Sequence, residues 1–308
     1  MKNFLITGSN GLLGQKLVHA LIKRDDVQII ATSFGANRLV EKKGYTYESL
    51  DITDKSAVKK IIEQYNPDVI INTAAMTNVD LCEQKRDECW ELNVTAVQNI
   101  VDVIEKVVTK QIHLIHLSTD FVFDGEKGVE YVETDKPNPL SHYAHSKYES
   151  ENILQRSKIK WAIARTIIVF GIADNMSRTN IVLWAKDALT KGQKLSIVDD
   201  QFRSPTLAED LADGCILIAD KGATGIYHLS GNKTMSILEL VYAVADYWKL
   251  DKSLITPSKS TTLNQAAKRP PYTGFIIDKA KHDLGYDPHS FLEGLEILGE
   301  QLKKVNQN

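Results

Sequence analysis

Short apolar segments alternate with amphipathic segments through the first half of the chain, and this alternation constrains the fold more than any other feature. The apolar segments are residues 4–6, 27–31, 69–71, 112–117 and 161–164. The amphipathic segments between them include residues 12–22, 56–65 and 93–107. Continuous apolar strands that alternate with helices are typical of a parallel sheet covered on both faces. The sequence therefore predicts a doubly wound α/β fold.

A glycine-rich turn directly follows the first apolar segment and opens the first amphipathic one. Its glycines are Gly8, Gly11 and Gly14. Glycine here permits a tight turn, close approach of the backbone to a pyrophosphate and close packing of helix on strand, while the helix N-terminus offers free N–H groups. Glycine spacing alone is a weak signal, but its position between strand and helix predicts a dinucleotide-binding Rossmann domain.

The chain loses this regularity after about residue 166. Residues 171–205 are polar and show no regular hydrophobic periodicity. Residues 206–219 have a helical pattern, and residues 226–229 have the pattern of one more strand. We therefore expect a Rossmann domain with a smaller C-terminal α/β substrate lobe. The expected division is residues 1–168 with about 206–230 for the dinucleotide-binding domain, and residues 169–205 with 231–308 for the lobe.

The ends of the second and third strands bear on the choice of cofactor. NAD-specific sites usually carry a carboxylate after the second strand, whereas a 2′-phosphate favours hydroxyls and a cation. Here that place holds Ser33 and Arg38 and no acid, which favours NADP(H) and leaves NAD(H) open; Arg38 as a solvated cation is the alternative. After the third strand, Asp51 is a candidate acceptor for the adenine amino group, and Asp54 is expected to cap the next helix.

The fourth strand leads into small residues. Ligands of open parallel sheets bind at the carboxyl ends of the strands, beside the point where the strand order reverses. Ala74 and Ala75 suit a backbone that lies flat against a cofactor, and Thr77 follows within reach of the nicotinamide end. The alternative is a plain small-residue turn in which Asn78 caps a helix.

A tyrosine and a lysine four residues apart are the candidate catalytic groups. Tyr143 and Lys147 share one helix face, and they follow a fifth strand that ends at Thr119. An ammonium beside a phenol lowers the pKa of the phenol by about 1–3 units, which makes tyrosine a usable general acid or base. A tyrosine and a lysine at this spacing are a weak signal on their own. They become a strong signal because they follow the glycine turn and the strand that ends at Thr119.

The bulk composition narrows the partners and the compartment. Lys and Arg number 37 and Asp and Glu 40, and the net charge of −3 gives no electrostatic case for nucleic acid or an anionic membrane. No apolar run approaches the about 20 residues of a membrane-spanning helix. Three cysteines without metal-type spacing predict free thiols and a cytoplasmic protein. His113 and His116 point to opposite faces of a strand, so they predict no metal site.

The sequence resembles the extended short-chain dehydrogenase/reductase superfamily and, within it, the dTDP-4-dehydrorhamnose reductases. The motifs that carry the resemblance span nearly the whole chain. They are residues 8–14, 51–52, 74–80, 92–94, 118–125, Tyr143 with Lys147, residues 200–206 and 269–270. Residues 118–125, STDFVFDG, form the most specific of these motifs.

The resemblance implies a reductase that transfers hydride from NADPH or NADH to a 4-keto nucleotide sugar. In this family the sugar is linked to dTDP and the reaction belongs to the synthesis of dTDP-L-rhamnose. The resemblance also implies that Tyr143 donates the proton, that Lys147 holds the nicotinamide ribose, and that Thr119 binds the reacting oxygen. With the positions above, the expected cofactor contacts are Gly8, Asn10, Gly11, Leu12, Leu13, Gly14, Ser33, Arg38, Asp51, Ile52, Ala74, Ala75, Met76, Thr77, Asn93, Tyr143 and Lys147. The expected substrate contacts are Thr77, Thr119, Asp120, Phe121, Arg203 and Arg269.

Two positions depart from the family pattern. Ile168 stands where the family often has a tryptophan near the sugar, and Arg203 stands where it has a small residue. Arg203 could clamp a diphosphate or only decorate a loop. The acid that some members use in a magnesium-bridged dimer is absent near Gln15 and Lys16, so the sequence supports no metal and leaves a homodimer open.

Two other functions stay open. A nucleotide-sugar epimerase would share the fold, whereas dehydratases of this superfamily usually carry Thr-Asp-Glu where this chain has Thr119, Asp120 and Phe121. A non-catalytic dinucleotide-binding subunit, like the regulatory subunit of methionine adenosyltransferase, has a similar fold and motifs. The presence of Tyr143 and Lys147 does not exclude it.

Overall fold

The computed structural model describes residues 1–107, 109–176, 178–262 and 265–305, with a seven-stranded parallel sheet at its centre. The strands are β1 (Lys2–Thr7), β2 (Val27–Ser33), β3 (Thr46–Ser49), β4 (Val69–Asn72), β5 (His113–Thr119), β6 (Lys160–Thr166) and β11 (Gly225–His228). They lie in the order β11–β6–β5–β4–β1–β2–β3, and each neighbouring pair is parallel. This confirms the predicted doubly wound α/β fold.

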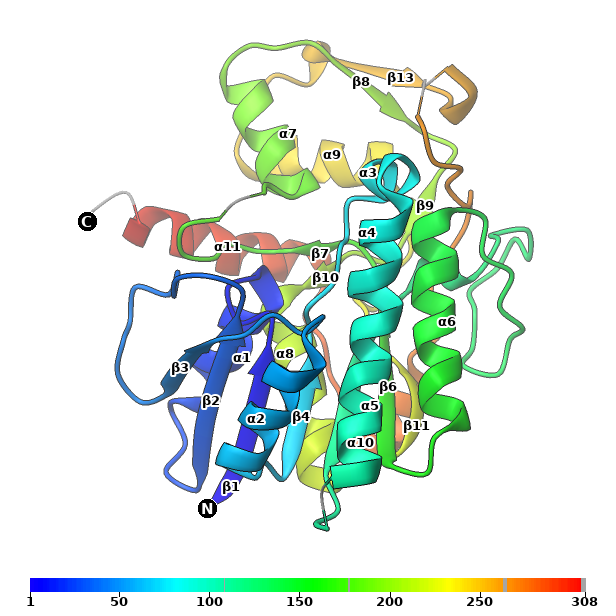
Figure 1. Ribbon diagram of the computed structural model, residues 1–308. Coiled ribbons are helices and arrows are strands. Elements are labelled where there is room, and N and C mark those ends of the chain that lie inside the picture. Colours follow the sequence, from blue (N-terminus) through cyan, green and yellow to red (C-terminus); the bar gives the residue numbers. More distant parts are fainter. Residues whose placement is uncertain (108, 177, 263–264, 306–308) are drawn as a thin grey trace.

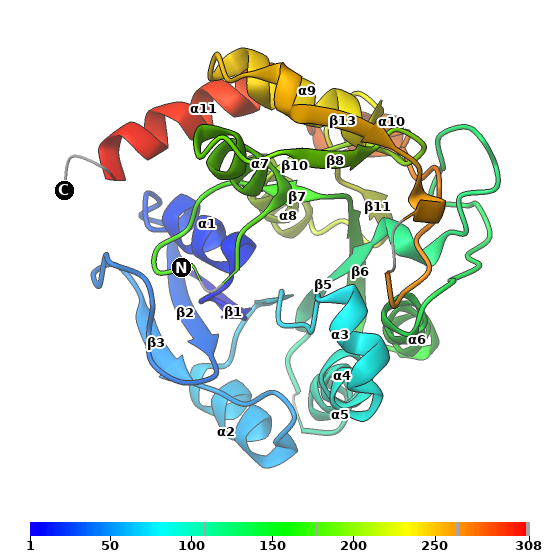
Figure 2. The same ribbon diagram turned by 90° about the horizontal axis from the view of Figure 1, so that it is seen from above.

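Helices cover both faces of the sheet, as Figure 2 shows from above. One face packs against α1 (Leu12–Leu21), α8 (Ala208–Lys221) and α10 (Asp278–Leu284). The other face packs against α2 (Lys55–Tyr65), α5 (Ala96–Val107) and α6 (His142–Arg156). Strand side chains alternate between the two cores: Val69 and Ile71 of β4 enter the first and Ile70 enters the second. Burial on both faces explains why these strands read as continuous apolar runs.

The strand order reverses at β1, which lies between β2 and β4. Thr7, the last residue of β1, pairs with Thr32 on one side and with Asn72 on the other. The loops that leave β1 and β4 therefore diverge at this point, and the carboxyl end of β5 lies next to them. This is the place where open α/β sheets bind their ligands.

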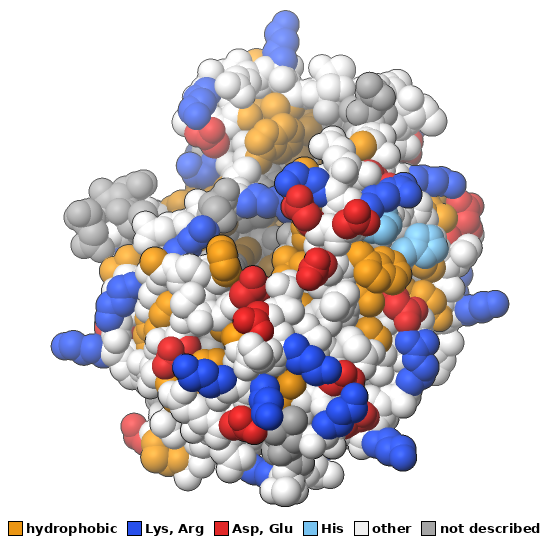
Figure 3. All heavy atoms as spheres, in the orientation of Figure 1, with side chains coloured by type: hydrophobic (Ala, Val, Ile, Leu, Met, Phe, Trp, Pro, Cys, Tyr) orange, Lys and Arg blue, Asp and Glu red, His pale blue; other side chains and the backbone are white. Residues whose placement is uncertain are grey.

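A third apolar core lies above the carboxyl ends of the strands (Figure 1). It is built mainly from α7 (Ile181–Thr190), β8 (Leu195–Val198), α9 (Ile237–Tyr247), β13 (Ile255–Ser258) and α11 (Phe291–Val305). Short sheets join the parts: β7 (Val169–Phe170) pairs with β10 (Thr206–Leu207), β9 (Phe202–Arg203) with β12 (Met235–Ser236), and β8 with β13. Figure 3 shows the surface hollowed below this lobe, with charges of both signs spread over the same face.

The division of the chain into a dinucleotide-binding domain and a smaller lobe stays a prediction. One segment assigned to the lobe packs against the central sheet instead. The sequence assigns residues 231–308 to the smaller lobe, but Phe275, Ile277 and Ala280 pack in the first sheet core. The reason is that α10 lies against α8 and β11 instead of against the upper helices.

Short elements link β4 to α5. They are α3 (Val79–Gln84), α4 (Arg86–Trp90) and a π-helical turn (Glu91–Thr95). The two predicted caps are confirmed: Asp54 accepts from the backbone N–H groups of Ser56 and Ala57, and Asn78 accepts from that of Leu81. No helix in the described part of the chain is both long enough and apolar enough to cross a membrane.

Candidate active site

The glycine turn after β1 is required by close backbone packing. Gly8 has φ +67°, and a Cβ there would lie 2.7 Å from the backbone nitrogen of Ala74. A Cβ on Gly14 would overlap the carbonyl oxygen of Gly8 and lie 2.6 Å from the Cα of Ser9. Gly11 is less crowded, with the Gly8 oxygen at 3.2 Å as its nearest neighbour. Gly8 and Gly14 therefore hold the turn tight between the ends of β1 and β4.

The turn leads into a helix N-terminus suited to a pyrophosphate. Gly11 is the N-cap of α1 and gives no side-chain cap, so the first-turn N–H groups of Leu12 and Leu13 stay available. The hydroxyl of Ser9 is buried and has no hydrogen-bond partner among the described residues. Free donors and the positive end of the helix dipole favour an anion here. The residues present fit a dinucleotide.

Asn10 organises the loop that follows β2. Its side-chain oxygen accepts from the backbone N–H of Arg38 (2.8 Å), and its amide nitrogen donates to the carbonyl of Ala36 (2.9 Å). Arg38 is exposed, and Ser33 ends β2 beside this loop. The cation predicted to read a 2′-phosphate is therefore held next to the glycine turn by its backbone, and the residue is exposed to solvent.

The predicted adenine contacts lie beyond β3. The carboxylate of Asp51 is exposed and accepts from the backbone N–H (2.9 Å) and hydroxyl (2.7 Å) of Thr53. Ile52 is buried in the second sheet core. Asp51 is thus oriented by Thr53 and keeps one carboxylate oxygen available for a ligand.

Asn93 fixes the segment after β4. Its side-chain oxygen accepts from the N–H of Met76 (2.8 Å), and its amide nitrogen donates to the carbonyl of Met76 (3.1 Å) and to the hydroxyl of Ser146 on α6 (3.0 Å). Asn93 sits in the π-helical turn, a feature frequent at functional sites. One side chain therefore joins residues 74–77 to α6. Ala74 and Ala75 are half-buried, and Thr77 is exposed.

Tyr143 and Thr119 meet at the carboxyl end of β5. Tyr143 lies in the first turn of α6, which Ser141 caps, and the tyrosine is 8% exposed. Burial raises the pKa of Tyr143 above its ordinary value, a hydrogen bond with Thr119 lowers it, and the charge of Asp120 raises it. The sequence predicts a phenol pKa lowered by Lys147; in the structure burial outweighs the favourable contacts.

Lys147 is turned toward β5. Its ammonium is buried, 3.2 Å from Nε2 of His116, and burial lowers the pKa of Lys147 to about 8 while Glu151 raises it. His116 is a strand residue that the sequence predicts only as a core histidine. Besides sharing a helix with Tyr143, Lys147 is therefore joined to a side chain of the central sheet.

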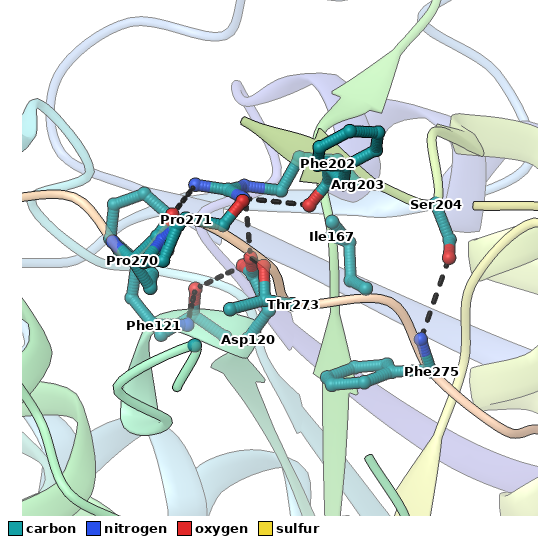
Figure 4. Close-up of polar contacts among 12 residues, drawn as sticks. Asp120, Phe121, Ile167, Phe202, Arg203, Ser204, Pro270, Pro271, Thr273 and Phe275 are labelled. Carbon is teal, nitrogen blue, oxygen red and sulfur yellow. Dashed lines mark hydrogen bonds and ion pairs between the residues drawn. The ribbon is translucent and has the colours of Figure 1, made fainter. Parts of the chain in front are cut away.

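Arg203 and Asp120 form a buried ion pair beside Thr119 (Figure 4). Nε of Arg203 lies 3.6 Å from Asp120, and the guanidinium donates to the carbonyl oxygens of Pro270 (2.6 Å) and Phe202 (2.7 Å). Asp120 also accepts from the hydroxyl of Thr273. Burial raises the pKa of Asp120, and the charge of Arg203 opposes that shift. The pair therefore connects β5 to the segment that returns from the upper lobe.

This position differs from both expectations for Arg203. The side chain is 2% exposed, so it neither decorates a loop nor offers a free clamp to a diphosphate. Its guanidinium donates three hydrogen bonds to the carbonyl oxygens of Phe202, Pro270 and Pro271, and its Nε faces Asp120. The difference arises because the partner carboxylate and the proline carbonyls come from segments far apart in the sequence.

Replacing Arg203 with methionine should cost about 3 kcal/mol of unfolding free energy, because it leaves the Asp120 carboxylate buried without its cation. The double variant with Asp120→Asn should recover part of this loss, since no buried charge then remains. Urea unfolding of the single and double variants measures both values. A loss below about 1 kcal/mol for Arg203→Met would mean that Asp120 is already neutral or solvated.

Arg269 is likewise paired. Its guanidinium donates to both carboxylate oxygens of Asp80 (2.7 and 3.2 Å), and the backbone N–H of Ala267 donates to the same group. Arg269 is partly exposed, whereas Arg203 is buried. The ring of Phe121 lies 6.2 Å from that of Tyr143 in an edge-on arrangement, and the Arg203 guanidinium lies 5.5 Å from the same ring.

Comparison with known proteins identifies the family. The model of the RmlD substrate binding domain family matches residues 1–304. The chain belongs to this family. A dTDP-4-dehydrorhamnose reductase of Aggregatibacter actinomycetemcomitans is 33% identical, over 97% of this chain and 98% of the relative. Methionine adenosyltransferase 2 subunit beta of Xenopus laevis is 30% identical, over 82% of this chain and 74% of the relative.

A solved structure of the RmlD type has the same architecture. It is a dTDP-4-dehydrorhamnose reductase from Bacillus anthracis str. Ames in complex with NADP, 28% identical, with a TM-score of 0.84 and coverage of 98% of this chain and 100% of that chain. The family assignment and the Rossmann fold predicted from the sequence are both confirmed.

One of the two positions that depart from the expected family pattern has an unusual backbone conformation. Ile168, where the resemblance leads us to expect a tryptophan, has φ +33°. A β-branched residue rarely adopts this conformation, and such strain gathers at functional sites. The carbonyl of Ile168 accepts from the N–H of Thr206 (3.2 Å), which holds the strained turn in place.

Sequence reasoning missed several contacts that shape this RmlD-family site. Arg178 donates to the hydroxyl of Thr77 (3.2 Å), and Asp174 accepts from the N–H of Val40 (2.7 Å) and exchanges hydrogen bonds with Gln15. Arg178 and Asp174 lie in the polar segment of residues 171–205, which has no hydrophobic periodicity from which their contacts could be predicted. In the described ranges, no three His, Cys, Asp or Glu side chains gather as a candidate metal site.

Proposed function

We propose that this protein is an NAD(P)H-dependent reductase of a 4-keto nucleotide sugar, similar to the dTDP-4-dehydrorhamnose reductases of its family. The observation that carries the proposal is the arrangement at the carboxyl end of β5. There the buried phenol of Tyr143 lies close to the hydroxyl of Thr119, on a strand that only β4 separates from β1, where the strand order reverses. This combines a dinucleotide site with a positioned proton donor.

The chain's residues fit a bound nicotinamide dinucleotide, which supplies the hydride when present. In this proposal the first turn of α1 and Gly11 hold the pyrophosphate, and Asp51 and Ile52 border the adenine. Residues 74–77, fixed through Asn93, line the path toward the nicotinamide, and Lys147 binds its ribose. The crowding at Gly8 and Gly14 supports the close approach of backbone and cofactor that this requires.

Tyr143 is proposed to donate the proton to the substrate oxygen. Burial keeps its pKa above the ordinary value of 10, so the phenol carries its proton at neutral pH. The hydroxyl of Thr119 donates to the carboxylate of Asp120 in the structure (3.0 Å), and in this proposal it turns to donate a second hydrogen bond to the substrate oxygen and so orients the carbonyl. As negative charge develops on that oxygen, these two donors stabilise it, and the phenol proton is transferred.

The proposed nucleotide is dTDP, and the proposed setting is a cytoplasmic enzyme that forms a homodimer. The family relatives named above support the nucleotide through their names. Phe121 and Arg269 are proposed substrate contacts, because Phe121 lies beside Tyr143 and both side chains keep some exposure. Thr77 borders the same space, and Asp120 acts on the substrate only through its neighbours.

A non-catalytic dinucleotide-binding subunit is the second candidate, favoured by the likeness to methionine adenosyltransferase 2 subunit beta. Isotope transfer separates it from a reductase. With NADPH that carries deuterium at both C4 positions and a 4-keto nucleotide sugar, a reductase places one deuterium on the sugar carbon and consumes one NADPH. An epimerase consumes no added NADPH, and a binding subunit transfers nothing. Absence of deuterium in the product would reject the proposed reaction.

The Arg38→Ala variant should lose about tenfold in affinity for NADPH and almost nothing for NADH. A charge-assisted hydrogen bond contributes about 1.5–3 kcal/mol, and exposure of Arg38 pulls the value to the lower end. Fluorescence titration with both cofactors measures the effect, and Lys43→Ala, an exposed cation of the same loop, is the control. The NADPH advantage should shrink with rising salt. Equal losses for both cofactors would show that Arg38 does not read the 2′-phosphate.

A further inference from the structure

A chain of buried polar side chains runs beneath the sheet ends to the amine of Lys147. The hydroxyl of Thr7 donates to the side-chain oxygen of Asn72 (2.5 Å), and Asn72 donates from its amide nitrogen to Nδ1 of His116 (3.0 Å). Nε2 of His116 lies 2.9 Å from the hydroxyl of Ser150 and 3.2 Å from the Lys147 amine. All five side chains are buried.

The orientation of the Asn72 side chain selects which ring nitrogen of His116 carries the proton. With the Asn72 oxygen accepting from Thr7, its amide nitrogen donates to Nδ1, and Nε2 then carries the hydrogen. The N–H at Nε2 then points toward Ser150 and Lys147, and the Ser150 hydroxyl donates to the carbonyl of Lys147 (2.6 Å). Burial holds the pKa of His116 well below its usual range, so the ring is neutral.

This tautomer discriminates between the two forms of Lys147. An uncharged amine can accept from the N–H of Nε2, whereas a charged ammonium brings a donor against a donor. The charged form is matched only if His116 moves its proton to Nδ1 and Asn72 turns its carbonyl oxygen toward the ring. Thr7 permits that turn, because a hydroxyl both donates and accepts.

The other groups that act on Lys147 do not replace this contact. Glu151, one turn further along α6, and Cys89 on α4 both favour the charged amine. Glu151 is engaged by Arg165 (2.6 and 2.9 Å) and by the hydroxyl of Ser118. Among the described residues, the one side-chain hydrogen bond recorded for the Lys147 amine is that with His116.

We propose that His116 is a positioning residue of the reductase: its ring holds the Lys147 amine, and its choice of tautomer, shared with Asn72, matches either protonation state of that amine. The kinetic part of this inference rests on the proposed function. The contact between His116 and Lys147 does not rest on the proposed function, since it is a property of the folded protein.

The tautomer is tested on the intact protein by NMR of ¹⁵N-histidine-labelled samples between pH 6 and 10. Above about pH 8 the His116 signals should be those of a neutral ring with hydrogen on Nε2, and they should move toward the Nδ1 tautomer as Lys147 gains its proton. Lys147→Met should abolish this change. His113, buried on the same strand with its pKa lowered to about 4, serves as the internal reference that stays neutral and unchanged.

A kinetic test uses His116→Gln, whose side-chain oxygen can accept from the ammonium and so favours the charged form. The pH at which turnover falls as Lys147 loses its proton should rise by about one unit, a tenfold change in that equilibrium. His113→Gln should leave the profile unchanged.

Two outcomes would overturn the proposal: His116 signals that do not depend on Lys147, or a pH profile of folded His116→Gln that coincides with the wild type. If His116→Gln does not fold, the NMR titration of the wild type decides alone. If the protein shows no reductase activity but the tautomer follows Lys147, the proposed function fails and the pairing stands.

Discussion

Tyr143→Phe is expected to lower turnover by about 10²–10⁴, the usual contribution of a general acid, while the affinity for NADPH changes little. The substitution removes only the phenolic oxygen, which lies close to the hydroxyl of Thr119. The glycine turn and the contact between Lys147 and His116 do not depend on that oxygen. Turnover is followed by NADPH absorbance, and binding by fluorescence titration.

Tyr148→Phe is the matched control, because Tyr148 lies on the same helix and packs against the first sheet core. It should retain nearly wild-type turnover. A Tyr143→Phe variant that reduced the substrate at the wild-type rate would show that another group supplies the proton.

Gly14→Ala should abolish measurable NADPH binding at concentrations that saturate the wild type, and should destabilise the protein by about 1–3 kcal/mol through overpacking. The new Cβ would meet backbone atoms of Gly8 and Ser9, which cannot move away as a flexible side chain could. The turn would have to open, and the N–H groups of α1 would lose their alignment. Titration with NADPH and urea unfolding measure the two effects.

Gly11→Ala tests whether crowding is the cause. Gly11 belongs to the same turn, has φ −79° and meets one neighbour at 3.2 Å, so its loss of NADPH affinity should be clearly smaller. Equal losses for both variants would mean that the loop needs flexible glycine rather than space at Gly14.

The fold could be predicted because its determinants are local. Each central strand is a short apolar run, and each predicted cap, such as Asp54 or Asn78, acts on a backbone two or three residues away. The position of Gly8 and Gly14 after such a run is also a local pattern. The family motifs then located Tyr143 and Lys147 on one helix.

The finer chemistry of the site could not be predicted, because it depends on residues that meet only in the folded chain. Arg203 finds Asp120 and Pro270 across long stretches of sequence, so an expected ligand for an anion is buried in an ion pair. The amine of Lys147 contacts His116 on β5, and burial raises the pKa of Tyr143, whereas the sequence predicts a pKa lowered by Lys147.

The central claim is tested most directly by a panel of 4-keto nucleotide sugars linked to dTDP, UDP or GDP, assayed by loss of NADPH absorbance. We predict consumption of one NADPH for each ketone reduced, fastest with a dTDP-linked sugar, and a roughly tenfold weaker affinity for NADH than for NADPH. A protein that binds NADPH but oxidises none with any sugar of the panel would contradict the account.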